Sequence, residues 1–182
     1  DFFDALKGVC RDVKKGELMK NHTSFKIGGE VDFLATPENF SEIKDLIKTC
    51  KENGVQYTII GNGSNILVGD EGIVGVVIKI SSGLTSVKID GNLIYAEAGV
   101  LLSTLANKVK LESLTGLEFA SGIPGTLGGA IYMNAGAYGG EMKDVVKKVG
   151  YLDSDGEIRE ISGADAGFGY RKSIFVDSDK II

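Results

Sequence analysis

Residues Ser121–Glu141 read SGIPGTLGGAIYMNAGAYGGE, a stretch in which glycine is too dense for an ordinary helix or strand. Glycine loses more conformational entropy on folding than any other residue, at a cost of about 0.5–1 kcal/mol relative to alanine inside a regular element. Two structures justify that cost: a series of tight turns with positive φ, or a loop whose main chain approaches a ligand and points N–H groups at it. Composition alone favours turns.

A second glycine-rich segment, GNGSN at Gly61–Asn65, follows the predicted strand Val55–Ile60. Glycine-rich turns at the carboxyl end of a buried strand commonly bind phosphates in α/β folds. The usual dinucleotide signatures do not fit, because Ile66 stands where a Rossmann fingerprint has its third glycine and no Gly-Lys-Ser/Thr follows. Instead, strand character is predicted to continue to Ile80.

The first half of the sequence predicts a βαβ-like unit. The apolar segment Val31–Ala35 predicts a strand, and Asn39 predicts a helix N-cap, with Glu42 at the third helical position of a capping box. Apolar residues at helical spacing follow, and Asn53-Gly54 predicts the end of the helix. The strand Val55–Ile60 completes the unit.

The second half predicts hairpins and a helix. Ser86–Glu97 and Val145–Ile161 each alternate around an Asp-Gly pair, at Asp90-Gly91 and Asp155-Gly156. Between them the apolar spacing over residues 101–109 predicts an amphipathic helix. The fold class is therefore α+β, with a first subdomain over residues 1–80 and a second, mixed subdomain over 81–182.

Composition limits the function. The chain has 182 residues and a net charge of −5, so we expect neither nucleic acid nor a membrane as a partner. Only Cys10, Cys50 and one histidine, His22, are present, which argues against a disulfide framework, a metal site and a Ser-His-Asp site, and favours a cytoplasmic setting. We expect His22 to be exposed.

The two ends indicate a portion of a longer protein. The sequence begins without an initiator Met and stops on the apolar pair Ile181-Ile182. We therefore expect that the chain is a fragment.

The glycine-rich segments predict a cofactor held between the two subdomains. They contain the hydroxyls of Ser64 and Thr126 in place of Lys or Arg, so we expect main-chain N–H groups to neutralise most of any phosphate charge. In GFGYRKSIF at Gly167–Phe175, Arg171 is a candidate for binding a carboxylate with two parallel hydrogen bonds. An ordinary surface ion pair is the alternative for Arg171.

Four motifs together resemble the UDP-N-acetylenolpyruvoylglucosamine reductase family, also called UDP-N-acetylmuramate dehydrogenases. They stand in the family's order and extend over nearly the whole chain: NHTSFKIGG at Asn21–Gly29, GNGSNILV at Gly61–Val68, the stretch Ser121–Glu141, and FGYRKSIF at Phe168–Phe175.

The resemblance implies an FAD-binding fold of the vanillyl-alcohol oxidase (PCMH) type, with FAD between two α/β subdomains. It implies a flavoprotein in which NADPH reduces FAD. Hydride then passes to the substrate, UDP-N-acetylglucosamine enolpyruvate, to give UDP-N-acetylmuramate for peptidoglycan precursor synthesis.

The resemblance also implies the site residues. Arg171 is the catalytic residue, because a guanidinium at the substrate carboxylate stabilises the charge that develops during hydride addition, and Tyr170 lies beside it in the substrate site. The residues implied to bind FAD are Gly61, Asn62, Gly63, Ser64, Asn65, Ile123, Pro124, Gly125, Thr126, Gly128, Gly129, Ala130, Asn134, Gly136, Ala137, Tyr138 and Gly139.

The family's serine proton donor and its glutamate belong to a C-terminal substrate domain that we expect this chain to lack. We therefore expect the chain to bind FAD without full reductase activity. Two alternatives stay open at this point: an FAD-dependent alcohol oxidase of the same fold, and a non-catalytic nucleotide-binding module.

Overall fold

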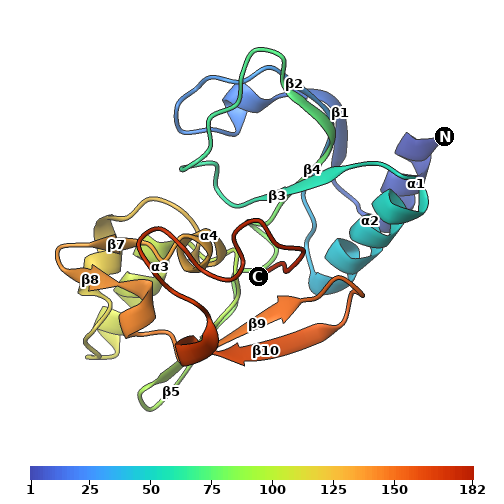
Figure 1. Ribbon diagram of the computed structural model, residues 1–182. Helices are drawn as coiled ribbons and strands as arrows, with labels where there is room; N and C mark the ends of the chain where they lie inside the picture. Colours follow the sequence, from blue (N-terminus) through green and yellow to red (C-terminus); the bar gives the residue numbers. More distant parts are fainter. The chain divides into compact units, whose positions relative to one another are not determined.

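The computed structural model describes residues 1–182 (Figure 1). The chain divides into two compact units, residues 1–84 and 85–182. Each unit has its own β-structure and its own buried apolar cluster.

Unit 1 is built on a four-stranded sheet in the order β1–β2–β4–β3. β1 (Val13–Leu18) pairs antiparallel with β2 (Glu30–Ala35), and β4 (Ile73–Lys79) runs parallel to both β2 and β3 (Tyr57–Ile60). The helix α2 (Phe40–Glu52) connects β2 to β3. The predicted βαβ unit is confirmed, with β4 inserted between its two strands.

The predicted ends of α2 are confirmed. The Asn39 side chain accepts a hydrogen bond from the Glu42 N–H at 3.0 Å. The Glu42 carboxylate accepts from the Glu38 N–H at 2.8 Å, so the return half of the capping box reaches one residue further back than predicted. Asn53 is the C-cap, and Gly54 follows with φ +64°.

A further helix, α1 (Phe2–Val9), precedes the sheet and was not predicted. Its N-cap is Asp1, which exchanges hydrogen bonds with Asp4. The rings of Phe2 and Phe3 lie 5.4 and 5.9 Å from the ring of Phe33 on β2. The short 3-10 turn η1 (Met19–Asn21) follows β1.

The prediction of continuous strand from Ile66 to Ile80 was wrong over its first part. Residues 66–69 are irregular, residues 70 and 71 form a turn, and β4 begins only at Ile73. The reason is a competing backbone contact: the Gly29 N–H donates to the Gly69 carbonyl at 2.8 Å, which ties this segment to the start of β2.

Unit 2 contains the two predicted hairpins. β5 (Val87–Asp90) pairs with β6 (Leu93–Ala96), and β9 (Lys148–Leu152) pairs with β10 (Ile158–Ser162), both antiparallel. The first hairpin turns at Gly91-Asn92, one residue later than its Asp-Gly pair. The predicted helix is α3 (Leu102–Leu111).

The remaining elements of unit 2 are short. They are η2 (Glu118–Gly122), α4 (Leu127–Tyr132), β7 (Gly136–Ala137), β8 (Gly140–Glu141), η3 (Met142–Asp144) and η4 (Gly163–Asp165). The helix α4 corrects the expectation that glycine is too dense here for a helix. Its buried residues Leu127, Ala130 and Ile131 join the apolar cluster of unit 2, so packing outweighs the low helix propensity of its two glycines.

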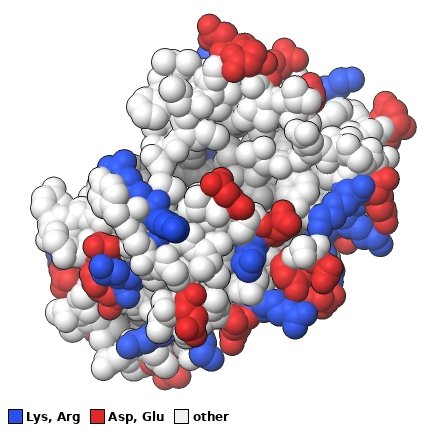
Figure 2. Space-filling view, in the orientation of Figure 1, with Lys and Arg blue, Asp and Glu red and all other residues white.

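Charge and hydropathy add two observations. On the face drawn in Figure 2, Lys and Arg are interspersed with Asp and Glu, so neither sign forms a continuous field there. None of the helices combines the length and the apolar character that crossing a bilayer requires.

Candidate functional site

In unit 1 the loop Gly61–Asn65 leaves the carboxyl end of β3 and packs against the connection between β1 and β2. Gly63 has φ +69°, and a Cβ there would collide with the His22 carbonyl oxygen. The Ser24 N–H donates to the Gly63 carbonyl at 2.9 Å. Two predicted motif segments are therefore in contact, and only glycine fits position 63.

The prediction that His22 is exposed was wrong. Its side chain is only 14% exposed, with Nε2 2.8 Å from Glu17 Oε1 and Nδ1 3.3 Å from Lys79 Nζ. An ammonium group has only donors, so Nδ1 accepts from Lys79 while Nε2 carries the proton and donates to Glu17. The histidine thus joins a carboxylate to a lysine.

The environment shifts the acidity of both partners. The hydrogen bond from His22 holds the pKa of Glu17 below its usual value. Burial lowers the pKa of Lys79, and the nearby positive charge of Lys14 adds to this effect. The Lys79 shift reflects partial desolvation at this end of the sheet, whereas the Glu17 shift reflects its hydrogen bond to His22.

A polar cavity of about 360 Å³ opens beside the loop. It is lined by Asn21, His22, Thr23, Ser24, Lys26, Asn62 and Lys79. Sequence reasoning missed Lys26 and Lys79. The signal for Lys79 is its register, because it pairs with Ile60, the residue before the glycine-rich loop.

In unit 2 the segment Ile123–Ala130 leads into α4 and lies along residues 98–102. Leu102 N–H donates to the Gly125 carbonyl at 3.0 Å, and Leu127 and Gly128 N–H groups donate to the carbonyls of Val100 and Ala98 at 2.8 and 2.9 Å. A Cβ on Gly128 would lie 2.9 Å from the Cβ of Ala98. Close backbone packing therefore accounts for glycine at position 128.

Several main-chain amides of this segment are already bonded within the protein. The Ile123 and Ala130 N–H groups donate to the carbonyls of Ala120 and Thr126. The N–H groups of Leu127 and Gly128 are also bonded, and Pro124 has none. The amides of this segment that remain for a phosphate are those of Gly125, Thr126 and Gly129.

Protein contacts do not account for every glycine in this stretch. A Cβ on Gly122 would meet nothing within 4 Å, and one on Gly129 would meet only the Thr126 hydroxyl at 3.5 Å. Neither residue has positive φ. Their bare backbone leaves room for a ligand, which is the arrangement that a closely approaching cofactor needs.

Asn134, predicted to bind FAD, is buried, with 4% exposure. Its side-chain N–H groups donate to Glu141 Oε2 at 2.6 Å and to the Gly169 carbonyl at 2.9 Å, and its Oδ1 accepts from the Lys143 N–H at 2.9 Å. The polar atoms of this side chain are therefore bonded to protein groups.

The predicted residues 136–139 form the hairpin of β7 and β8. Gly136 and Ala137 pair with Glu141 and Gly140, and the turn between them holds Tyr138 with φ +52° and Gly139 with φ +83°. The Tyr138 side chain is 96% exposed. An aromatic ring is thus presented to solvent at the tip of the hairpin.

Tyr170 and Arg171 occupy a tight turn closed by hydrogen bonds between Gly169 and Lys172 in both directions. Arg171 has φ +48°, an uncommon conformation for this residue type that often marks functional positions. Its guanidinium carbon lies 5.6 Å from the centre of the Tyr170 ring, a cation–π contact. The guanidinium is held at an exposed tip.

The turn is anchored on both sides. Asn134 binds Gly169, and the Ser173 hydroxyl donates to the Tyr132 carbonyl at the end of α4 at 2.7 Å. Phe175 beyond it is buried, and its ring lies 5.6 Å from that of Tyr151. The structure therefore brings the predicted substrate residues together with the segment 132–141.

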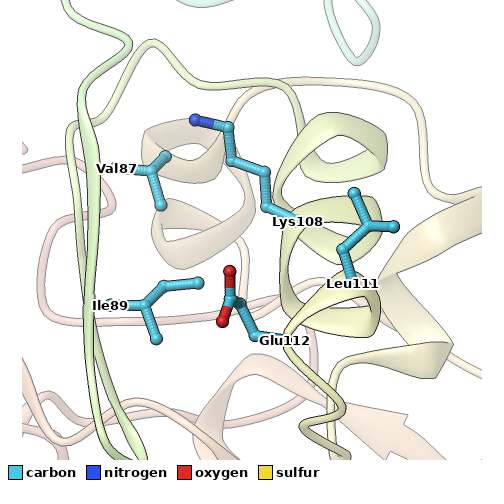
Figure 3. A pocket seen from close by; sticks show the side chains of 5 residues that line it. All are labelled: Val87, Ile89, Lys108, Leu111 and Glu112. Carbon is cyan, nitrogen blue, oxygen red and sulfur yellow. The ribbon is translucent and has the colours of Figure 1, made fainter.

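A second hollow in unit 2 contains none of the predicted site residues. It has a volume of about 360 Å³, and Figure 3 shows Val87 and Ile89 of β5 facing Lys108 and Glu112 at the end of α3, with Leu111 beside them. No group of three or more His, Cys, Asp or Glu side chains in either unit could hold a metal ion.

The residues present fit FAD in both units. Unit 1 offers a glycine-rich loop beside a cationic cavity, which suits phosphate groups. Unit 2 offers open main chain at Gly122 and Gly129.

Comparisons with known proteins agree with this fit. Residues 31–162 match the family model described as an FAD binding domain. The UDP-N-acetylenolpyruvoylglucosamine reductase of Alkaliphilus oremlandii is 57% identical over 158 residues, which cover 87% of this chain and 52% of that protein. The chain spans about half the length of the curated relatives it matches.

Solved structures agree in fold. The crystal structure of UDP-N-acetylenolpyruvylglucosamine reductase from Thermus caldophilus matches with a TM-score of 0.79 and 35% identity, covering 93% of this chain and 59% of that one. Phl p 4.0202, a glucose dehydrogenase, matches with a TM-score of 0.67 over 88% of this chain and 38% of that one. At 14% identity this second likeness concerns the fold alone.

Proposed function

The chain belongs to the FAD binding domain family, and we propose that it is the FAD-binding part of a reductase that uses NADPH to convert UDP-N-acetylglucosamine enolpyruvate to UDP-N-acetylmuramate. The observation that carries the proposal is the open main chain at Gly122 and Gly129, which no protein contact explains. The names of the relatives support the choice of reaction.

Each unit contributes one glycine-rich segment to FAD in this proposal. Gly61–Asn65 binds from unit 1, and Ile123–Ala130 binds from unit 2 through the amides of Gly125, Thr126 and Gly129. When bound, FAD supplies a carrier that accepts hydride from NADPH and donates it to the substrate. Asn134 acts as a positioning residue, because its side chain binds Glu141 in the β7–β8 hairpin and Gly169 in the turn of Arg171.

Arg171 binds the substrate carboxylate in this proposal. Hydride addition to the enolpyruvyl group leaves negative charge on the carbon conjugated to that carboxylate, and a fixed guanidinium stabilises the charge as it develops. Its strained backbone, of a kind that often marks functional positions, and the contact of its guanidinium with the Tyr170 ring support this role.

We assign the reaction to the cytoplasm, in keeping with two free, buried cysteines. The chain spans about half the length of its curated relatives. We therefore propose that the chain alone binds FAD without turning over the sugar nucleotide.

The test measures NADPH oxidation that depends on the enolpyruvyl UDP-sugar, in the full-length protein and in this chain. We expect activity in the full-length protein only. In the full-length protein we expect Arg171→Ala to lower kcat/KM by about 100-fold to 1,000-fold and to leave FAD affinity unchanged. Lys172→Ala is the matched control, because it removes a neighbouring exposed cation.

Two results would overturn the proposal. One is a full-length protein whose NADPH oxidation does not respond to the sugar nucleotide but whose flavin is reduced by an alcohol. The other is an Arg171→Ala variant that performs as well as Lys172→Ala.

A further inference from the structure

The cavity of unit 1 is assembled from three separate segments at one edge of the sheet. The β1–β2 connection supplies His22 and Lys26, the loop after β3 supplies Asn62, and the end of β4 supplies Lys79. Ile60 and Lys79 are register partners on parallel strands, so the lysine leaves the sheet at the same edge as the glycine-rich loop. The sheet itself therefore fixes a cation beside that loop.

Lys79 is held in place by a chain of polar contacts. Its ammonium donates to His22 Nδ1 at 3.3 Å, and the opposite ring nitrogen donates to Glu17 at 2.8 Å. His22 takes one of the three ammonium N–H donors, which leaves the others for a ligand in the cavity. Glu17 does not line the cavity, so its carboxylate fixes the histidine without contacting a ligand bound there.

The rest of the lining also suits an anion. A turn with the Lys26 N–H bonded to the Thr23 carbonyl at 3.2 Å, and φ +57° at Lys26, brings a second lysine to the rim. Asn62 and Ser24 add neutral donors, and no Asp or Glu side chain is among the lining residues. A cavity with two cations and several neutral donors matches the charge and the acceptors of a phosphate group.

We propose that this cavity is a phosphate-binding site in which Lys79, positioned by His22 and Glu17, supplies the principal cation and Lys26 and Asn62 complete the contacts. The inference rests on the proposed function, because the ligand we assign is a phosphate of the FAD diphosphate. In unit 1 this proposal replaces the expectation that main-chain N–H groups neutralise most of the phosphate charge. A free diphosphate shares the same chemistry and is distinguished in the test.

The test compares FAD affinity, followed by flavin fluorescence at constant ionic strength, in the wild-type chain and three variants. Lys79→Met keeps the aliphatic stem and removes the charge, Lys79→Arg keeps the charge, and Lys48→Met removes an exposed charge from α2 in the same unit. We expect Lys79→Met to weaken FAD binding about tenfold, the value of one charge-assisted hydrogen bond. Lys79→Arg recovers most of that loss, and Lys48→Met binds as tightly as the wild type.

Two further ligands test whether the effect of Lys79 depends on the phosphate groups of FAD. Riboflavin has no phosphate, so its affinity is the same in the wild type and in Lys79→Met. Inorganic pyrophosphate, titrated by calorimetry, reports the cavity without the rest of FAD. Pyrophosphate binding that depends on Lys79 identifies a general diphosphate site, and dependence seen only with FAD identifies a site specific for the dinucleotide.

The failure of this inference differs from the failure of the proposed function. If the wild type binds FAD and the dissociation constant of a folded Lys79→Met variant is within twofold of the wild-type value, the assignment of the phosphate site is wrong. The proposed function then stands. If the wild type does not bind FAD, the proposed function fails, and the pyrophosphate titration decides the cavity on its own. Circular dichroism spectra of all variants establish that each is folded.

Discussion

The side chain of Asn134 joins two loops, because its N–H groups donate to Glu141 Oε2 at 2.6 Å and to the Gly169 carbonyl at 2.9 Å. Glu141 lies on β8, next to the hairpin tip at Tyr138, and Gly169 opens the turn that carries Arg171. A single buried amide therefore links the hairpin that contains the predicted FAD-binding residues 136–139 to the turn that carries Arg171.

Replacing Asn134 is expected to destabilise unit 2. Asn134→Ala removes the donor to the part-buried Glu141 carboxylate and Gly169 carbonyl, at a cost of about 1 kcal/mol for each hydrogen bond lost. Alanine is also strained at φ +46°, whereas glycine is not. We expect a loss of about 2–4 kcal/mol in the free energy of unfolding for Asn134→Ala and about 1 kcal/mol less for Asn134→Gly, measured by urea denaturation. Wild-type stability in both variants would contradict this role.

Gly63→Ala tests the packing of the first loop. The added Cβ would collide with the His22 carbonyl and would also be strained at φ +69°. Gly54 has φ +64° but open space around it, so Gly54→Ala carries the backbone strain without the collision. We expect Gly54→Ala to cost about 1 kcal/mol and Gly63→Ala clearly more, with loss of FAD binding. Equal melting temperatures for the two variants would exclude the collision.

Gly122→Ala separates stability from ligand binding. A Cβ at position 122 has no protein neighbour within 4 Å, and the same holds at Gly150 on β9. Both substitutions are expected to leave the melting temperature unchanged or slightly raised, because alanine restricts the unfolded chain. Only Gly122→Ala should weaken FAD binding. Identical FAD affinities would show that the open backbone at Gly122 does not face the cofactor.

The two cysteines are expected to be unreactive in the folded chain. Burial raises the pKa of Cys10 and of Cys50 to about 11 from 9.0. Because the thiolate is the reactive species, reaction with a disulfide reagent at pH 8 should be roughly 100-fold slower than in guanidinium chloride. The raised pKa values also affect stability, because the unfolded thiols ionise at a lower pH than the folded ones. The contribution of the buried thiols to the free energy of unfolding is therefore complete below pH 9.0 and is lost as the pH rises towards 11. Equal rates in native and denaturing buffer would contradict the burial.

The elements predicted well are those whose signals are local. The caps of α2 at Asn39 and Asn53 and the two hairpins depend on residues a few positions apart, and the structure contains each of them to within one residue of its predicted place. The helix α4 was missed because packing against residues such as Ala98 decides it, against the low helix propensity of Gly128 and Gly129. No local pattern reports such a contact.

The candidate site was only partly predictable for the same reason. The glycine-rich segments and Arg171 are visible as motifs, whereas the cavity depends on Lys79, which lies 57 residues from His22 in sequence. The exposure expected for His22 followed from its polar neighbours and ignored this distant partner. Main-chain amides were expected to bind phosphate over the whole of Ile123–Ala130. The N–H groups of Leu127 and Gly128 instead donate to the carbonyls of Val100 and Ala98, which only the fold reveals.

Whether the two glycine-rich segments hold FAD is decided by titrating the purified chain with FAD, followed by flavin absorbance and fluorescence, with FMN as the comparison that lacks the diphosphate and adenosine. We predict saturable binding to one site per chain and much weaker binding of FMN. A folded chain that binds neither flavin, or that binds FMN as tightly as FAD, would contradict the assignment of these segments to the cofactor.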